Sequence, residues 1–153
     1  MNIVDGDLIE LGANGAFDVI VHGCNCFNTM GAGIAKLIKD RFPEAYEVDL
    51  KTEKGDRGKL GTITTATVEC DGRPLTIVNA YTQFDFRRVD GVVNADYDAI
   101  RRSFSLIKTE FGGQRIGYPM IGAGLAGGDW DVISQIIDDE LVGENHTLVR
   151  FKP

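Results

Sequence analysis

The sequence is short of the residue types that mark secreted or membrane proteins. Its 153 residues include only three cysteines, and two of them, Cys24 and Cys26, are two positions apart. An odd count with this spacing is a poor disulfide framework and is typical of a reducing cytoplasm. The chain starts without the basic segment of a signal peptide, and no apolar run approaches the roughly 20 residues of a membrane span. We therefore expect a cytoplasmic protein with no membrane partner.

Basic residues are also scarce. Sixteen Lys and Arg against 23 Asp and Glu give a net charge of −7, which argues against the basic face of a general nucleic-acid binder. An anionic ligand would have to be held by backbone N–H groups and helix N-termini. The hydrophobic fraction of 43% excludes a disordered chain, and the length predicts a single domain over residues 1–153.

Glycine, with 19 residues, is what the sequence has in excess. Two glycine loops, residues 22–34 and 121–130, each lie between an apolar strand pattern and a helix pattern. In α/β sheets ligands bind beyond the carboxyl ends of strands, where glycines let the backbone approach a phosphate. Either loop alone is explained equally well as a tight turn. Two such loops in one small acidic domain favour an anionic ligand.

Short apolar or β-branched runs alternate with helical spacing along the whole chain. The predicted strands are residues 3–4, 18–21, 62–68, 75–80, 115–119 and 147–151; the predicted helices are 34–42, 44–50, 100–111 and 130–141. Asp71-Gly72-Arg73-Pro74 predicts a hairpin turn, and Asp129 is well placed to cap the last helix. The pattern predicts an α/β fold with a mixed, largely parallel central sheet covered on both faces.

Taken together, these motifs resemble the macro domain family over nearly the whole chain, from Val4-Asp5-Gly6-Asp7-Leu8 to the last strand. The resemblance implies a three-layer α/β/α macro domain whose ligand is ADP-ribose or a derivative, with no cofactor and no metal. In the adenine-recognition segment, Asp7 would accept from the adenine amino group and the backbone of Leu8 would assist.

The resemblance also assigns the two glycine loops to ligand binding. Asn25 would contact the distal ribose, although asparagine also simply tolerates turn geometry. The other residues of the first ligand loop are Thr29, Met30, Gly31, Ala32, Gly33 and Ile34. The diphosphate loop consists of Gly122, Ala123, Gly124, Leu125, Ala126 and Gly127.

The segments His22-Gly23-Cys24-Asn25 and Gly127-Gly128-Asp129-Trp130 resemble those of the ADP-ribose-1″-phosphate phosphatases, one branch of the family. A related branch that removes ADP-ribose from glutamate uses a lysine and an aspartate where this chain has Gln83 and Ala126. That departure speaks against a lysine-adduct mechanism. Another de-ADP-ribosylating branch has asparagine in place of His22, which again favours the phosphatase-like interpretation.

Two side chains are candidates for catalysis. His22 ends a predicted strand at the rim of the first loop, and a histidine titrating near pH 6.5 is a natural base for activating water. Asp129 is a candidate general acid or water-orienting group. The alternatives are a structural histidine and a plain helix N-cap.

Three other groups have weaker claims to a role in the site. His22, Cys24 and Cys26 lack the fourth ligand and the spacing of a zinc site, so no metal is expected. Phe27, Phe84 and Phe86 are candidates for stacking on adenine or for core packing. The pair Arg87-Arg88 could meet a terminal phosphate or the end of a nucleic acid, or form a solvated surface turn.

Three functions remain open at this point. The first is hydrolysis of ADP-ribose-1″-phosphate to ADP-ribose and phosphate. The second is a non-catalytic ADP-ribose reader module. The third is removal of ADP-ribose from ADP-ribosylated protein or nucleic acid. All three share the same binding residues.

Overall fold

The computed structural model describes residues 1–152 and has a six-stranded sheet of order β1-β6-β5-β2-β4-β3. Its strands are β1 (Asn2–Gly6), β2 (Val19–Cys24), β3 (Ile63–Cys70), β4 (Arg73–Tyr81), β5 (Ile116–Tyr118) and β6 (His146–Phe151). Neighbouring strands are parallel except for the antiparallel hairpin β3–β4. The predicted mixed, largely parallel sheet and the predicted hairpin are confirmed.

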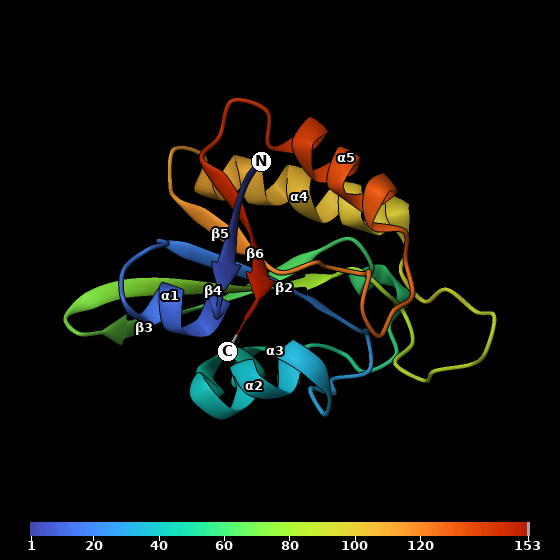
Figure 1. Ribbon diagram of the computed structural model, residues 1–153. Helices are drawn as coiled ribbons and strands as arrows, with labels where there is room; N and C mark the ends of the chain where they lie inside the picture. The colour runs from blue at the N-terminus through green and yellow to red at the C-terminus, as the bar shows by residue number, and fades with distance from the viewer. Residues whose placement is uncertain (153) are drawn as a thin grey trace.

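Helices cover both faces of this sheet, as predicted (Figure 1). They are α1 (Leu8–Ala13), α2 (Gly33–Arg41), α3 (Pro43–Leu50), α4 (Tyr97–Phe111) and α5 (Trp130–Glu140), with a 3-10 turn η1 (Arg57–Lys59). Helices α4 and α5 pack their apolar stripes on one face around Val19, Val21 and Val78. Helices α1, α2 and α3 pack on the other face around Ile20 and Ile77. The alternation of Val19, Ile20 and Val21 between the two cores follows from the two-residue period of a strand.

Capping residues set several helix boundaries. Asp129 caps α5 by accepting from the N–H of Asp131 at 2.9 Å, which confirms the predicted cap. Pro43 stands in the first turn of α3, where its missing N–H has no intrahelical partner to lose. Helix α1, which the sequence pattern did not predict, is only six residues long and is capped by Asp7.

Strand β2 is longer than predicted, and this changes the place of His22. The strand continues past Val21 to Cys24 because its last three residues stay in register with β4, where His22 lies opposite Asn79. The prediction that His22 lies at the rim of a loop is therefore wrong. His22 is an interior strand residue on the side of the sheet covered by α2 and α3, and it is fully buried.

The loops that follow β2, β4 and β5 come together on one side of the molecule, at the right of Figure 1. These are the carboxyl ends of parallel strands, where α/β folds place their ligands. None of the helices within residues 1–152 combines the length and the apolar character needed to cross a membrane.

Candidate ligand-binding site

A cavity of about 630 Å³ lies where these three loops meet, a volume within the usual range for small-molecule sites. One wall is the first glycine loop with the start of α2, the opposite wall is the second glycine loop, and residues of the loop after β4 complete it. The lining residues are Gly23, Cys24, Asn25, Thr29, Met30, Gly31, Ala32, Gly33, Ile34, Ala35, Gln83, Phe86, Arg88, Pro119, Met120, Ile121, Gly122, Gly124, Leu125 and Ala126.

Both walls present backbone N–H groups that the protein itself does not use. In the first turn of α2, the N–H groups of Gly33, Ile34 and Ala35 donate to no protein acceptor within residues 1–152. The N-cap residue Ala32 has no side chain able to satisfy them. These free donors, at the positive end of the helix dipole, favour an anion.

The second glycine loop repeats this arrangement on the opposite wall. Among the described residues, the N–H groups of Gly124, Leu125 and Ala126 likewise find no protein acceptor. The loop is closed by a bond from the N–H of Gly128 to the carbonyl of Gly122, at 2.7 Å. Successive unpaired N–H groups in such a turn form a concave anion-binding nest.

The two walls approach each other closely at Gly33 and Leu125. A Cβ atom added to Gly33 would lie 3.3 Å from Cδ1 of Leu125, and Gly33 also has a φ of +59°, which favours glycine. By contrast, a Cβ added to Gly31 or Gly124 would meet nothing within 4 Å. The positive φ therefore favours glycine at position 33, while Gly31 and Gly124 border open space.

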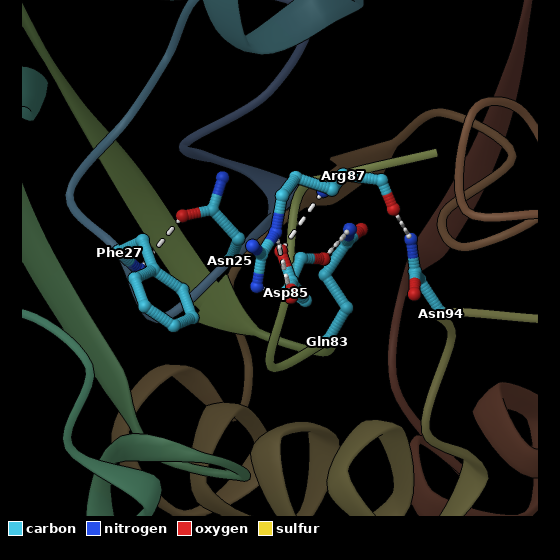
Figure 2. A network of polar contacts seen from close by, with 6 residues as sticks. All are labelled: Asn25, Phe27, Gln83, Asp85, Arg87 and Asn94. Atoms are coloured by element: carbon cyan, nitrogen blue, oxygen red, sulfur yellow. Dashed lines mark hydrogen bonds and ion pairs between the residues drawn. The ribbon is translucent and has the colours of Figure 1, made fainter. Parts of the chain in front are cut away.

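Asn25 lines the cavity, and its side chain organises the first loop from within. Its Oδ1 accepts from the N–H of Phe27 at 2.8 Å (Figure 2). Its Nδ2 donates to the hydroxyl of Thr29 at 2.8 Å and to the carbonyl of Thr29 at 3.1 Å. The side chain thus holds the loop in shape at the position where the family resemblance expects a ribose contact.

The loop after β4 is held in place by a chain of polar contacts (Figure 2). Gln83 donates to the carbonyl of Asp85 at 2.7 Å, and the guanidinium of Arg87 bonds both carboxylate oxygens of Asp85. Asn94 donates to the carbonyl of Arg87 at 2.8 Å. The Arg87 guanidinium holds the pKa of Asp85 down at about 2, so this ion pair stays charged at neutral pH.

This loop brings Arg88 and Phe86 to the cavity. It is tied to the second glycine loop because the N–H groups of Asn94 and Ala95 both donate to the carbonyl of Ala126. Phe27 contacts the ring of Phe84 edge-on at 5.0 Å and that of Phe86 at 6.0 Å between centroids. Among the described lining residues, Arg88 carries the one charged side chain, and its charge adds to that of the N–H groups.

His22 does not line the cavity. Its Nε2 lies 2.6 Å from Oδ1 of Asn79, and the amide nitrogen of Asn79 donates to the carbonyl of Ala45. Because this fixes Oδ1 as the atom facing the ring, His22 donates from Nε2 in its neutral form. Burial lowers the pKa of His22 to about 4, partly offset by the bond to Asn79. A buried, uncharged histidine outside the cavity is not placed to take a proton from water there.

Asp7 and Asp129 also lie outside the set of lining residues. The carboxylate of Asp7 accepts from the N–H groups of Ile9 and Glu10 at 2.9 and 3.2 Å. The exposed side chain of Asp129 caps α5, and its backbone N–H donates to the hydroxyl of Tyr97. Both carboxylates thus have helix-capping partners, the alternative that the sequence left open for Asp129.

The structure therefore brings together most, but not all, of the predicted ligand residues. Outside the lining set are the adenine segment, Asp7 and Leu8, and two residues of the diphosphate loop, Ala123 and Gly127. The lining residues that sequence reasoning did not assign to binding are Gly23, Cys24, Ala35, Gln83, Pro119, Met120 and Ile121. The sequence pattern could have indicated some of them. Gly23 and Cys24 fall in the first glycine loop, and Pro119 ends the predicted strand before the second glycine loop.

The cysteines near the cavity do not have the properties of a reactive or metal-binding group. Burial raises the pKa of the Cys24 thiol well above its usual value and raises that of Cys26 as well. Within residues 1–152, no three or more histidine, cysteine or carboxylate side chains are grouped to hold a metal ion.

Known proteins similar to this chain cover nearly its whole length. No protein-family model matches it. It is 38% identical over 156 residues to an uncharacterized 17.5 kDa protein of the tk-vs intergenic region of Enterobacteria phage T4, covering 98% of this chain and 96% of that protein. It is 24% identical over 165 residues to the ADP-ribose 1″-phosphate phosphatase of the yeast Meyerozyma guilliermondii, covering 90% and 91% of the two chains.

A further relative is the DNA ADP-ribosyl glycohydrolase of Mycobacterium tuberculosis, 30% identical over 135 residues. The match covers 85% of this chain but only 35% of that protein. Among solved structures, the macrodomain of Thermus aquaticus DarG superposes with a TM-score of 0.75 at 24% identity, over 99% of this chain and 97% of that one. Thermosipho africanus DarTG in complex with ADP-ribose superposes with a TM-score of 0.72 at 16% identity, over 100% and 42%.

The sheet order, the helices on both faces and the two glycine loops at the carboxyl ends of β2 and β5 define an α/β protein of the macrodomain fold. The fold and these relatives support the predicted macro domain family. The predicted three-layer architecture is confirmed.

Proposed function

We propose that this chain binds ADP-ribose in the cavity, with the diphosphate held by the N–H groups of residues 33–35 and 124–126. The observation that carries the proposal is that two separate sets of unpaired donors line one cavity in a protein of net charge −7. Such donors hold a phosphate without a lysine cluster. The proposal is supported by the structurally similar DarTG protein, which was solved in complex with ADP-ribose.

Calorimetric titration tests this proposal directly. We expect a Kd in the micromolar range, or about 8 kcal/mol, and much weaker binding of AMP, which lacks the second phosphate and the distal ribose. The variant Gly124→Glu places a carboxylate at a position that borders open space, so it should fold and lose affinity by like-charge repulsion. Ser105→Glu, which also adds one negative charge but at an exposed position of α4 outside the cavity lining, should bind as the wild type does. A wild-type protein that gives no heat with ADP-ribose would rule out the proposal.

For the reaction, we propose hydrolysis of ADP-ribose-1″-phosphate to ADP-ribose and phosphate. The name of the yeast relative supports this choice. Phosphomonoester hydrolysis has a loose transition state and depends mainly on positioning and charge stabilisation. Arg88 and the unpaired N–H groups can supply both. No histidine, aspartate or glutamate is among the described lining residues, so the proposal gives no proton-transfer step to His22 or Asp129.

Two other functions remain in competition, and one assay separates all three. The name of the mycobacterial relative favours removal of ADP-ribose from DNA. The absence of an acid or base from the described lining residues favours a reader that binds without turnover. Phosphate release from ADP-ribose-1″-phosphate should be measured beside ADP-ribose release from modified DNA and modified protein. Turnover of only the modified macromolecules would replace the phosphatase proposal, and binding without any turnover would leave the reader.

A further inference from the structure

Lys59 is a buried cation outside the cavity lining, and its ammonium donates hydrogen bonds to two other buried or half-buried side chains. It belongs to the short η1 turn, and only 7% of its surface is exposed. Its ammonium donates to Oδ1 of Asn28 at 2.6 Å and to the hydroxyl of Thr52 at 2.8 Å, and it lies 5.2 Å from the centre of the Tyr81 ring. Both hydrogen-bond acceptors are neutral oxygens. The buried carboxylate of Asp49, which accepts from the hydroxyl of Tyr81, is near enough for the charge of Lys59 to lower its pKa, although burial raises that pKa overall. Because Lys59 makes no direct ion pair with it among the described residues, the hydrogen bonds of the ammonium to Asn28 and Thr52 need a further explanation.

Asn28 links Lys59 to the cavity wall. Its φ is +58°, a left-handed conformation that few non-glycine residues adopt. Beyond the bond from Lys59, its amide nitrogen donates to the carbonyl of Thr52 at 2.9 Å, and its own carbonyl accepts from the hydroxyl of Tyr46 at 3.1 Å. Asn28 is thus fixed from three sides.

The residue after Asn28 begins the cavity wall. Residues 29–35 all line the cavity and lead into the unpaired N–H groups at the start of α2. The dihedral angles of Asn28 set the direction in which this segment leaves the loop. A change of conformation at Asn28 would therefore move the donors of Gly33, Ile34 and Ala35 as a group.

We propose that Lys59 is a positioning residue for the ligand site: its ammonium holds Asn28 in the left-handed conformation and thereby sets the geometry of the anion-binding wall at residues 29–35. This inference rests on the proposed binding of ADP-ribose at that wall. Lys59 acts through Asn28 and makes no contact with the ligand.

The main test is Lys59→Met, which keeps the length of the side chain and removes its charge and donors. We expect a modest fall in thermal stability, because the buried carboxylate of Asp49 loses a nearby positive charge. We also expect ADP-ribose affinity to fall about ten-fold, as for the loss of a buried charged hydrogen bond. In amide NMR spectra of the free protein, the resonances of residues 29–35 should shift more than those of the rest of the chain. The matched control is Lys54→Met, an exposed lysine, which should change neither quantity.

The route through Asn28 is tested by a double-mutant cycle. Glycine at position 28 can adopt the positive φ but lacks the side-chain oxygen to which Lys59 donates. If Lys59 acts through Asn28, then adding Lys59→Met to Asn28→Gly should produce little further loss of affinity. Fully additive losses would overturn the route. Should Lys59→Met fail to fold, Asn28→Gly with Lys59→Gln provides the same comparison.

Two results would overturn the proposal. One is a folded Lys59→Met variant with unchanged affinity and unchanged amide resonances at residues 29–35. The other is a variant whose amide resonances change evenly over the whole chain, because this indicates a purely structural role. The NMR measurement needs no ligand. It therefore tests the positioning role even if the wild type does not bind ADP-ribose.

Discussion

The ring of His22 donates from Nε2 to Oδ1 of Asn79, 2.6 Å away on the adjacent strand. Because β2 and β4 pair in register at these two residues, the bond joins neighbouring strands on the sheet face covered by α3, and neither residue lines the cavity. Burial lowers the pKa of His22 to about 4, whereas an unfolded chain gives histidine a pKa near 6.5. The relationship makes His22 a contributor to pH-dependent stability.

Stability should fall as the pH drops through this window. Between pH 6.5 and 4, His22 binds a proton in the unfolded chain but stays neutral in the folded chain. Acidification therefore favours the unfolded state and lowers the free energy of unfolding. We expect about 2 kcal/mol less stability at pH 5 than at pH 7 from this residue, measured by urea unfolding. His22→Gln keeps a donor for Asn79 and should have a flatter pH profile. Identical profiles for the two proteins would contradict the assignment. Burial also lowers the pKa of His146. Because both proteins contain His146, subtracting one pH profile from the other removes its contribution.

Gly33 and Gly31 form a matched pair for testing the shape of the cavity wall. Gly33→Ala should lose about 1–2 kcal/mol of stability from its left-handed backbone and should weaken ADP-ribose binding, since its Cβ would crowd Leu125. Gly31→Ala borders open space and has no positive φ, so its effect on both quantities should be smaller. Thermal unfolding and calorimetry measure the two effects. Equal effects of the two variants would show that neither the backbone conformation of Gly33 nor its approach to Leu125 matters for the site.

Arg88 and Arg87 are neighbours with different surroundings. Arg88 lines the cavity, whereas Arg87 is paired with Asp85. Arg88→Ala should therefore weaken ADP-ribose-1″-phosphate by about ten-fold, the loss of one charged contact, and should reduce the salt dependence of binding. Arg87→Ala should have a smaller effect on affinity. Calorimetric titrations at two salt concentrations measure both effects. A larger loss of affinity in Arg87→Ala than in Arg88→Ala would show that Arg87, and not Arg88, interacts with the ligand.

The role of Asp7 in adenine recognition remains a prediction. Two substitutions can separate that role from its capping of α1. Asn caps a helix about as well as Asp, whereas Ala costs about 1 kcal/mol. Asp7→Asn should therefore keep the stability of the wild type, and Asp7→Ala should not. If the carboxylate accepts from the adenine amino group, Asp7→Asn should weaken ADP-ribose more than ribose 5-phosphate. Unchanged affinity for both ligands would leave Asp7 with capping alone.

The sequence predicted best what depends on neighbouring residues. Asp129 caps α5 because a carboxylate just before an apolar helix pattern can reach the first free N–H groups. Helix α1 was missed because a six-residue helix is too short to show a period. His22 was misplaced because the Gly23 that follows it reads as a loop, and only pairing with β4 continues the strand through it.

The part of the site built by distant segments was the hardest to predict. Phe86 and Arg88 line the cavity because Asn94 and Ala95 tie their loop to Ala126. The support of Asn28 by Lys59 spans 31 positions of sequence. Neither contact leaves a local pattern, so both depend on the folded sheet that brings the loops together.

The central claim is that backbone N–H groups from two walls hold one diphosphate, and amide NMR spectroscopy tests it most directly. On titration of the ¹⁵N-labelled protein with ADP-ribose, the amide resonances of Gly33, Ile34, Ala35, Gly124, Leu125 and Ala126 should all shift with one common saturation curve. Adenosine, which has no phosphate, should leave them nearly unchanged. Shifts confined to one wall, or located mainly outside the cavity, would contradict the account.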